Sequence, residues 1–205
     1  MKQNYSWIVA CGIMLALSAM LAGCTSLSIP SVAHAPFHKE TWRQRHRALT
    51  RVRRWNIDGA FSVRQPHKSV IAAYTWQQRG RSYSIRIHSS LNIYSAAITG
   101  RPGYVTLQRS KQQRFSARSP ERLMEKQFGW HLPLSTLFYW IRGLPAPGKD
   151  HAKFDAYGHL VYLQQAGWRV QFSHYVPVGT VDLPRTLQLN SRRLSVKIVI
   201  KHWKL

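Results

Sequence analysis

The chain has 205 residues, 30 Lys and Arg against 7 Asp and Glu, and two cysteines. This length suits one domain that buries most of its apolar surface, and two cysteines exclude a disulfide-dense scaffold. The formal charge of +23 favours anionic partners, chiefly nucleic acid or anionic lipid.

The first 23 residues have the pattern of an export signal. Lys2 gives a basic start, and the run from Trp7 to Leu21 contains no charge. That run has the length of the apolar core of a signal peptide and is shorter than a membrane span of ~20 residues. The sequence therefore predicts a signal peptide over residues 1–23.

The signal ends in Leu21-Ala22-Gly23-Cys24, which resembles the lipobox of bacterial lipoproteins. The resemblance implies cleavage after Gly23, covalent N-acyl and S-diacylglycerol lipid on Cys24, and anchorage outside the cytoplasm. Thr25 stands where that class uses aspartate to retain a protein at the inner membrane, which indicates the outer membrane. The alternative is an ordinary secretory signal in which Cys24 has no role.

Export changes what the charge implies. Loss of residues 1–23 removes Cys11 and, among charged residues, only Lys2, so the mature chain keeps a formal charge of +22 and has no thiol for a disulfide once Cys24 is acylated. The basic residues are scattered from Arg43 to Lys204 without a nucleic-acid motif. We therefore expect no nucleic acid and predict outer-membrane phospholipid as the anionic partner, at about 1 kcal/mol per nearby Lys or Arg. A high charge without a specific role is the alternative.

Residues 24–38 are rich in Ser, Pro and Ala and are predicted to form the lipidated N-terminus and a tether. Residues 39–205 are predicted to be a single lipid-binding domain. It opens with an amphipathic helix over 39–54, in which Trp42, His46, Leu49 and Val52 share one face. Such a helix can lie on a membrane surface or pack on the domain.

After Arg54 the apolar period shortens to two, which predicts strands. Val70, Ala72, Tyr74 and Trp76 mark one face of the first clear strand. Further faces are Tyr83, Ile85 and Ile87, then alternating runs over 93–99 and 104–108. Later come Leu160 and Tyr162, Trp168 to Phe172, Leu187 and Leu189, and Leu194 to Ile200. Short links between the early strands predict an antiparallel meander.

The middle of the chain is predicted to be helical. Ser119 is placed as an N-cap before Pro120, and Gly129 is placed to end that helix. A second helix begins near Pro133 and ends at Gly143. A sheet of about ten or eleven strands is expected to curl into an open or closed barrel, with these helices over its mouth. Its aromatic and branched side chains either line a lipid-sized cavity or fill a core.

Catalytic chemistry is not indicated. The seven acids show no spacing that pairs them as general acid and base, and no Gly-x-Ser-x-Gly motif occurs. The ten histidines lack carboxylate partners at metal-ligand spacing and are expected on the surface. The sequence predicts a protein that is not an enzyme and has no metal or other cofactor.

Two segments carry a more specific resemblance, residues 129–134 (Gly-Trp-His-Leu-Pro-Leu) and residues 140–145 (Trp-Ile-Arg-Gly-Leu-Pro). Together with Gly59-Ala60-Phe61, Trp76-Gln77-Gln78 and Pro102-Gly103, they resemble the LolB family over nearly the whole chain from Trp42. The resemblance implies a mainly β fold, an open (half) antiparallel β-barrel of about 11 strands with a helical lid enclosing a hydrophobic cavity.

The same resemblance implies a function. Members are outer-membrane lipoproteins, lipid-anchored and facing the periplasm, that accept lipoproteins from the periplasmic carrier LolA. They bind the acyl chains of the cargo and insert it into the inner leaflet of the outer membrane. We expect a monomer. The rival hypothesis is a non-catalytic basic assembly or structural lipoprotein that binds a protein partner or an envelope polymer.

The resemblance also assigns a role to one residue. Leu91, in Ser89-Ser90-Leu91-Asn92, matches an exposed leucine that drives cargo into the membrane, although the family's usual Asn-Pro-Leu-Gly is changed around it. The predicted cavity residues are Phe61, Tyr74, Trp76, Ile85 and Ile87 from the strands and Leu137, Trp140 and Ile141 from the lid.

Overall fold

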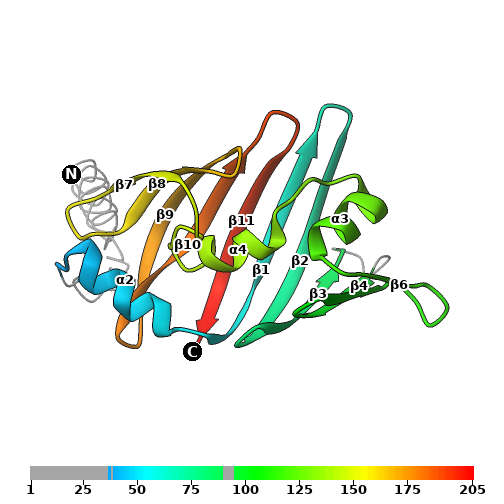
Figure 1. The fold of residues 1–205 in the computed structure, drawn as a ribbon, viewed down its shortest axis with the longest axis horizontal. Coiled ribbons are helices and arrows are strands. Elements are labelled where there is room, and N and C mark those ends of the chain that lie inside the picture. The colour runs from blue at the N-terminus through cyan, green and yellow to red at the C-terminus, as the bar shows by residue number, and fades with distance from the viewer. Residues whose placement is uncertain (1–36, 38, 90–94) are drawn as a thin grey trace, which may run out of the picture. The chain divides into compact units, whose positions relative to one another are not determined.

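The computed structural model describes residues 37, 39–89 and 95–205 (Figure 1). Within these ranges, eleven strands form one antiparallel sheet in the order β6-β5-β4-β3-β2-β1-β11-β10-β9-β8-β7. The strands are β1 (Arg54–Gln65), β2 (Lys68–Arg79), β3 (Ser82–His88), β4 (Ser95–Arg101), β5 (Tyr104–Gln108), β6 (Arg114–Ala117), β7 (Asp150–Phe154), β8 (Leu160–Gln165), β9 (Trp168–Val178), β10 (Val181–Asn190) and β11 (Ser195–Lys204). Because β6 and β7 are the two edges and do not pair, the sheet is open, and the predicted fold class is confirmed.

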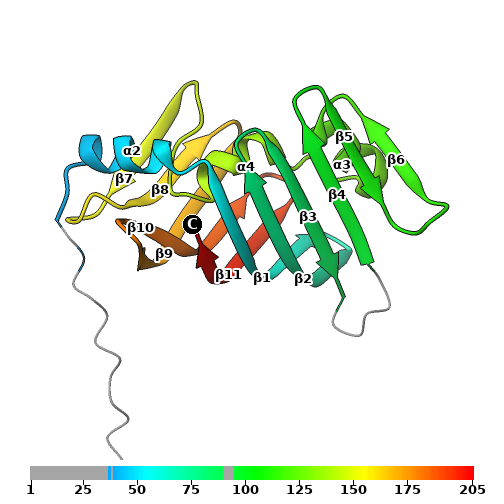
Figure 2. The same cartoon turned by 90° about the horizontal axis from the view of Figure 1, so that it is seen from below.

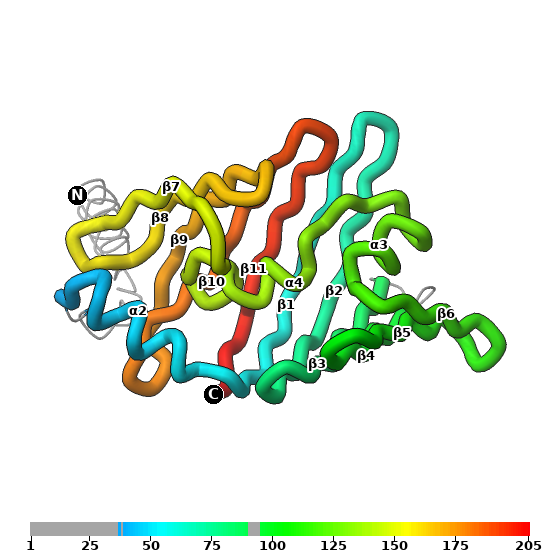
Figure 3. Tube along the Cα trace, viewed as in Figure 1, coloured from blue at the N-terminus to red at the C-terminus, as the bar shows by residue number. Residues whose placement is uncertain are grey.

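This strand order explains the position of the helices. β6 and β7 are consecutive in sequence but lie at opposite edges, so the chain between them must cross the sheet. Figure 3 traces this crossing through α3 (Pro120–Phe128) and α4 (Leu134–Trp140). In Figures 1 and 2, α3 lies over the β5 and β6 side and α4 over the middle of the sheet. The predicted lid therefore follows from the topology.

The ends of the lid helices are set by local chemistry. The Ser119 side chain accepts a hydrogen bond from the Arg122 N–H, Pro120 occupies the first turn, and Gly129 ends α3 with φ 68°, as predicted. The second helix, α4, is shorter than predicted. Its N-terminal turn has no side-chain cap of its own. Glu121 of α3 supplies an acceptor instead, because the Ser135 N–H donates to Glu121 Oε1 at 2.8 Å.

The first helix, α2 (Trp42–Arg51), begins with a capping box between Thr41 and Gln44. It ends three residues earlier than predicted, because Val52 is already extended. Leu49 is 1% exposed and packs in a small apolar cluster with Leu144, Val181 and Leu183. Of the two alternatives for this helix, packing on the domain is the one observed.

The strand faces follow the predicted alternation. In β2, Ala72, Tyr74 and Trp76 are buried, whereas Ile71 is 70% exposed on the opposite face. A bulge between Asp58 and Gly59 bends β1 against β11. A Cβ at Gly59 would lie 1.9 Å from the Val199 carbonyl oxygen, so only glycine permits this close approach.

Two of the predicted segments lie almost wholly outside the described residues. These are the signal peptide over 1–23 and the tether over 24–38, of which only Phe37 is described. The division of the chain into these segments and a domain over 39–205 stays a prediction. No helix in the described part of the chain has both the length and the hydropathy needed to cross a membrane.

Candidate functional site

An apolar cavity of about 80 Å³ lies between the sheet and the lid. Its walls come from β1, β2, β3, β4 and β11 on one side and from α3, α4 and the segments flanking α4 on the other. The lining residues are Phe61, Val63, Tyr74, Trp76, Ile85, Ile87, Ile98, Met124, Leu132, Leu134, Leu137, Ile141, Val196 and Ile198.

Seven of the eight predicted cavity residues line this space: Phe61, Tyr74, Trp76, Ile85, Ile87, Leu137 and Ile141. Trp140 does not. Its side chain is fully buried, and its indole N–H donates to Gln165 Oε1 of β8 at 3.0 Å, so it anchors the lid to the sheet.

Strand register brings the lining side chains together. Trp76 is opposite Ile85, which is in turn opposite Ile98, and Tyr74 is opposite Ile87. Side chains directly opposite one another share a sheet face and lie close together. The strand walls of the cavity are thus three neighbouring strands in register, completed by Phe61 opposite Ile198.

The cavity has little polar chemistry. The Trp76 indole N–H is satisfied by Gln78 Oε1 at 2.8 Å. The Tyr74 hydroxyl is buried and has no hydrogen-bond partner among the described residues, and burial raises the pKa of Tyr74 well above its ordinary value. Apart from the Tyr74 hydroxyl, its lining residues carry no acid, base or nucleophile, so the cavity suits an apolar ligand.

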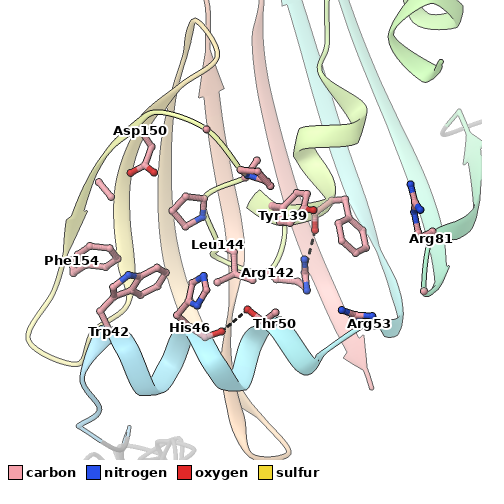
Figure 4. A pocket seen from close by; sticks show the side chains of 17 residues that line it. Trp42, His46, Thr50, Arg53, Arg81, Tyr139, Arg142, Leu144, Asp150 and Phe154 are labelled. Carbon is pink, nitrogen blue, oxygen red and sulfur yellow. Dashed lines mark hydrogen bonds between the residues drawn. The ribbon is translucent and has the colours of Figure 1, made fainter. Parts of the chain in front are cut away.

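A larger pocket, of about 760 Å³, lies beside the lid and is of mixed character (Figure 4). One end is aromatic, where the ring centroids of Trp42 and Phe154 are 4.4 Å apart. At the other end lie Arg53 and Arg81. Arg142 also borders it, but its guanidinium is held by the carbonyl oxygens of Leu49 and Val52, so it is not available to a ligand.

One polar cluster was not predicted from the sequence. His159 is 1% exposed, contrary to the expectation of surface histidines. Its Nδ1 lies 3.0 Å from Asp155 Oδ2, and its Nε2 lies 3.0 Å from Asp182 Oδ2. Arg45 of α2 also donates to Asp182 Oδ2 at 3.0 Å. The four-residue spacing of Asp155 and His159 is visible in the sequence, but the pairing with Asp182 and Arg45 depends on the fold.

Metal ligation is not a feature of the described residues, among which no group of three His, Cys, Asp or Glu side chains is placed to hold an ion. In the cluster around His159, Arg45 instead pairs with Asp182, and Tyr175 covers the imidazole, on which its ring stacks with centroids 4.2 Å apart.

Comparison with known families identifies the family of the chain that carries this cavity. Residues 53–203 match the family model described as "LolB: Outer membrane lipoprotein LolB". The chain belongs to the LolB family. The resemblance seen in the sequence is thereby confirmed, and a LolB-family lipoprotein is not an enzyme.

Relatives support this LolB assignment over most of the chain. The Outer-membrane lipoprotein LolB of Coxiella burnetii (strain RSA 493 / Nine Mile phase I) is 59% identical over 193 residues, covering 94% of this chain and 92% of that protein. The Outer-membrane lipoprotein LolB of Pseudomonas aeruginosa (strain LESB58) is 37% identical over 187 residues, covering 91% of each chain.

Solved structures share the fold of this LolB-family chain. A LolA superfamily protein from Nitrosomonas europaea superposes with a TM-score of 0.52 at 9% identity, covering 81% of this chain and 94% of that chain. A DUF1329 family protein from Desulfovibrio piger gives 0.53 at 6% identity, covering 80% of this chain and 90% of that chain. At such identities the likeness concerns the fold alone.

Two of the predicted LolB-type sites, Cys24 and Leu91, lie outside the described residues. β3 and β4 pair as antiparallel neighbours, and Leu91 belongs to the segment that connects them. Its role, like that of Cys24, stays a prediction.

Proposed function

We propose that this chain is an outer-membrane lipoprotein that accepts other lipoproteins from a LolA-like periplasmic carrier and inserts them into the inner leaflet of the outer membrane. The observation that carries the proposal is the apolar cavity beneath the lid of a LolB-family fold. We propose further that Cys24 carries covalent N-acyl and S-diacylglycerol lipid, that the domain faces the periplasm as a monomer, and that no other cofactor takes part.

The cargo's acyl chains provide the driving force. Each methylene that enters an apolar cavity contributes about 0.8 kcal/mol. Handover needs no nucleotide if the acceptor binds the chains more tightly than the carrier does. Insertion into the bilayer then releases further free energy, because the chains leave a small cavity for a continuous apolar phase.

The lid must move for this to happen. The cavity of about 80 Å³ is well below the ~300–1,000 Å³ of typical ligand sites. Met124, Leu134 and Leu137 contact the cavity from the helical side, so a shift of α3 and α4 away from the sheet enlarges it without breaking strand pairs. We infer that this is the closed position of the lid.

Insertion needs an apolar group at the membrane. We assign this to Leu91, following the family pattern, because a leucine on the β3–β4 connection can enter the headgroup region while the sheet stays outside.

The test uses a carrier loaded with radiolabelled lipoprotein and the mature chain carrying Cys24→Ala, which are mixed and then separated. We expect label on the chain. Ile87→Asn places an amide in the cavity wall, which lowers the transferred label about tenfold because burying an unpaired amide is costly.

Ile71→Asn is the matched control, since Ile71 is on the neighbouring strand but 70% exposed, and we expect it to transfer normally. Label that remains on a competent carrier would sink the acceptor proposal and favour an assembly lipoprotein instead.

A further inference from the structure

A second pocket, of about 380 Å³, adjoins the apolar cavity and is called here the basic pocket. It lies between the β2–β3 turn, the β4–β5 turn, the start of α3 and helix α4. Trp76 and Leu134 line both this pocket and the apolar cavity, so the two spaces share a wall. When the lid moves away from the sheet, the two spaces are close enough to take the polar head and the apolar chains of one ligand.

The pocket is cationic. Three arginines line it, from the β2–β3 turn (Arg81), the end of β4 (Arg101) and the residue before the N-cap of α3 (Arg118). All three are exposed, and none forms an ion pair or side-chain hydrogen bond with another residue in the described ranges. Arg81 is visible at the edge of Figure 4, on the turn that also borders the larger pocket.

No carboxylate lines the basic pocket. Glu121, which follows the lining residue Pro120 in sequence, accepts a hydrogen bond from the backbone N–H of Ser135 and so links the two lid helices. The hydroxyl of Tyr83, whose ring also lines the pocket, is buried and lacks a hydrogen-bond partner in the described part of the chain. Its ring lies against Gly100, where any Cβ would come within 2.1 Å of it. Tyr83, one of the residues that line the pocket, thus has a buried hydroxyl that pairs with no other described residue.

We propose that the basic pocket binds the phosphate of an anionic phospholipid whose acyl chains enter the adjoining apolar cavity. This inference rests on the proposed function, since it uses the same cavity and the same lid. Three arginines that line one pocket from separate segments suit a phosphate, whose oxygens accept charge-assisted hydrogen bonds. An uncharged diacylglycerol of the same chain length lacks the group that they bind.

The test measures binding of phosphatidylglycerol and of diacylglycerol with identical acyl chains to the purified lipidated protein in a neutral detergent, by native mass spectrometry. We expect phosphatidylglycerol to bind about tenfold more tightly. The triple variant Arg81→Gln, Arg101→Gln, Arg118→Gln should lose this preference and keep its binding of diacylglycerol.

The matched control is the triple variant Arg169→Gln, Arg192→Gln, Arg193→Gln. It removes the same charge from exposed residues at the opposite ends of the strands, and we expect it to keep the preference. If the two triple variants lose the preference for phosphatidylglycerol equally, the net charge of the protein and not the basic pocket is responsible, and the proposed site is overturned. Binding of free glycerol phosphate tests whether the headgroup alone suffices. If glycerol phosphate binds as tightly as phosphatidylglycerol, the acyl chains add nothing, and the proposal is overturned.

The remaining outcomes separate this inference from the proposed function. Equal binding of the two lipids by the unmodified chain overturns the phosphate site and leaves the acceptor function standing. Binding of neither lipid overturns the phosphate site, whereas the acceptor function is decided by the handover of labelled cargo. A triple variant that keeps its preference for phosphatidylglycerol but no longer receives cargo from the carrier would assign the pocket to the carrier protein.

Discussion

Arg142 is a charged residue in the core, 2% exposed. Its Nη1 donates to the carbonyl oxygens of Leu49 at 3.1 Å and Val52 at 2.8 Å, which lie at the C-terminal end of α2. Its guanidinium also lies 4.3 Å from the ring centroid of Phe138. Burial lowers the pKa of Arg142 to about 10, and neighbouring Tyr139 partly offsets this. One side chain therefore joins α2 to the lid.

Arg142→Met should lower the free energy of unfolding by about 2–4 kcal/mol, because it fills the space but leaves buried carbonyl groups without donors. Urea unfolding measures the change. The control is Arg53→Met, since Arg53 is exposed and has no ion-pair partner among the described residues. Similar losses in the two variants would show that removal of charge, and not the carbonyl contacts, is responsible.

For single residues, periodicity predicted which strand side chains line the cavity, but it did not predict what every lid side chain contacts. An alternation of two fixes which face of a strand a residue occupies, so Tyr74, Trp76 and Ile85 could be placed from the sequence. A helix offers several buried directions, and Trp140 points to Gln165 of β8 instead of the cavity. The pattern shows that such a residue is buried but not what it contacts.

At the scale of elements, α2 is fastened to the sheet by the cluster of Arg45, Asp155, His159 and Asp182. Asp182 of β10 accepts from α2 and faces the His159 ring, so one carboxylate joins a helix, a strand and a loop. Breaking one partner of a buried charge cluster is costly because it leaves the others without compensation.

Asp182→Asn should therefore destabilise the protein by about 3 kcal/mol and speed hydrogen exchange in α2 more than in β1 and β2. Asp58→Asn is the control. Asp58 pairs with His202 at the surface, where the side chains are 43% and 77% exposed, so its loss should cost less than about 1 kcal/mol. Unchanged exchange in α2 would contradict a fastening role.

The elements differ in how well sequence predicts them. Long strands with one buried face, such as β2 and β11, were clear, and the capped ends of α3 were correct. β6 and β7 were not predicted, because they are short edge strands and hardly bury a side chain. The cluster that holds α2 depends on residues 137 positions apart in sequence, which local patterns do not report.

At the scale of the whole chain, the order of strands determines both the lid and the cavity. Because β6 and β7 occupy opposite edges, the connection between them has to pass over one face of the sheet, and the space beneath it becomes the cavity. The approximate number of strands and the place of the helices in the middle of the chain could be predicted from the sequence. The size of the closed cavity could not, since it depends on how closely the lid side chains pack.

The net charge of +23 is a property of the whole chain as well. Arginines lie at both ends of the strands, as with Arg81 and Arg101 at one end and Arg192 and Arg193 at the other. A field this widely spread attracts any anionic surface and does not by itself orient the molecule. Such attraction weakens with salt, because the screening length falls from ~10 Å at 0.1 M to ~3 Å at 1 M.

We therefore expect the Cys24→Ala chain, which lacks the lipid anchor, to bind phosphatidylglycerol vesicles at low salt and to be released as salt rises, as measured by co-sedimentation. Phosphatidylcholine vesicles are the control and should bind weakly at every salt concentration. Binding that persists at high salt would contradict a purely electrostatic attraction, because screening leaves apolar insertion intact. In that case Leu91→Ser, which removes the proposed apolar tip, should abolish the residual binding, and the charge would then serve only to bring that tip to the membrane.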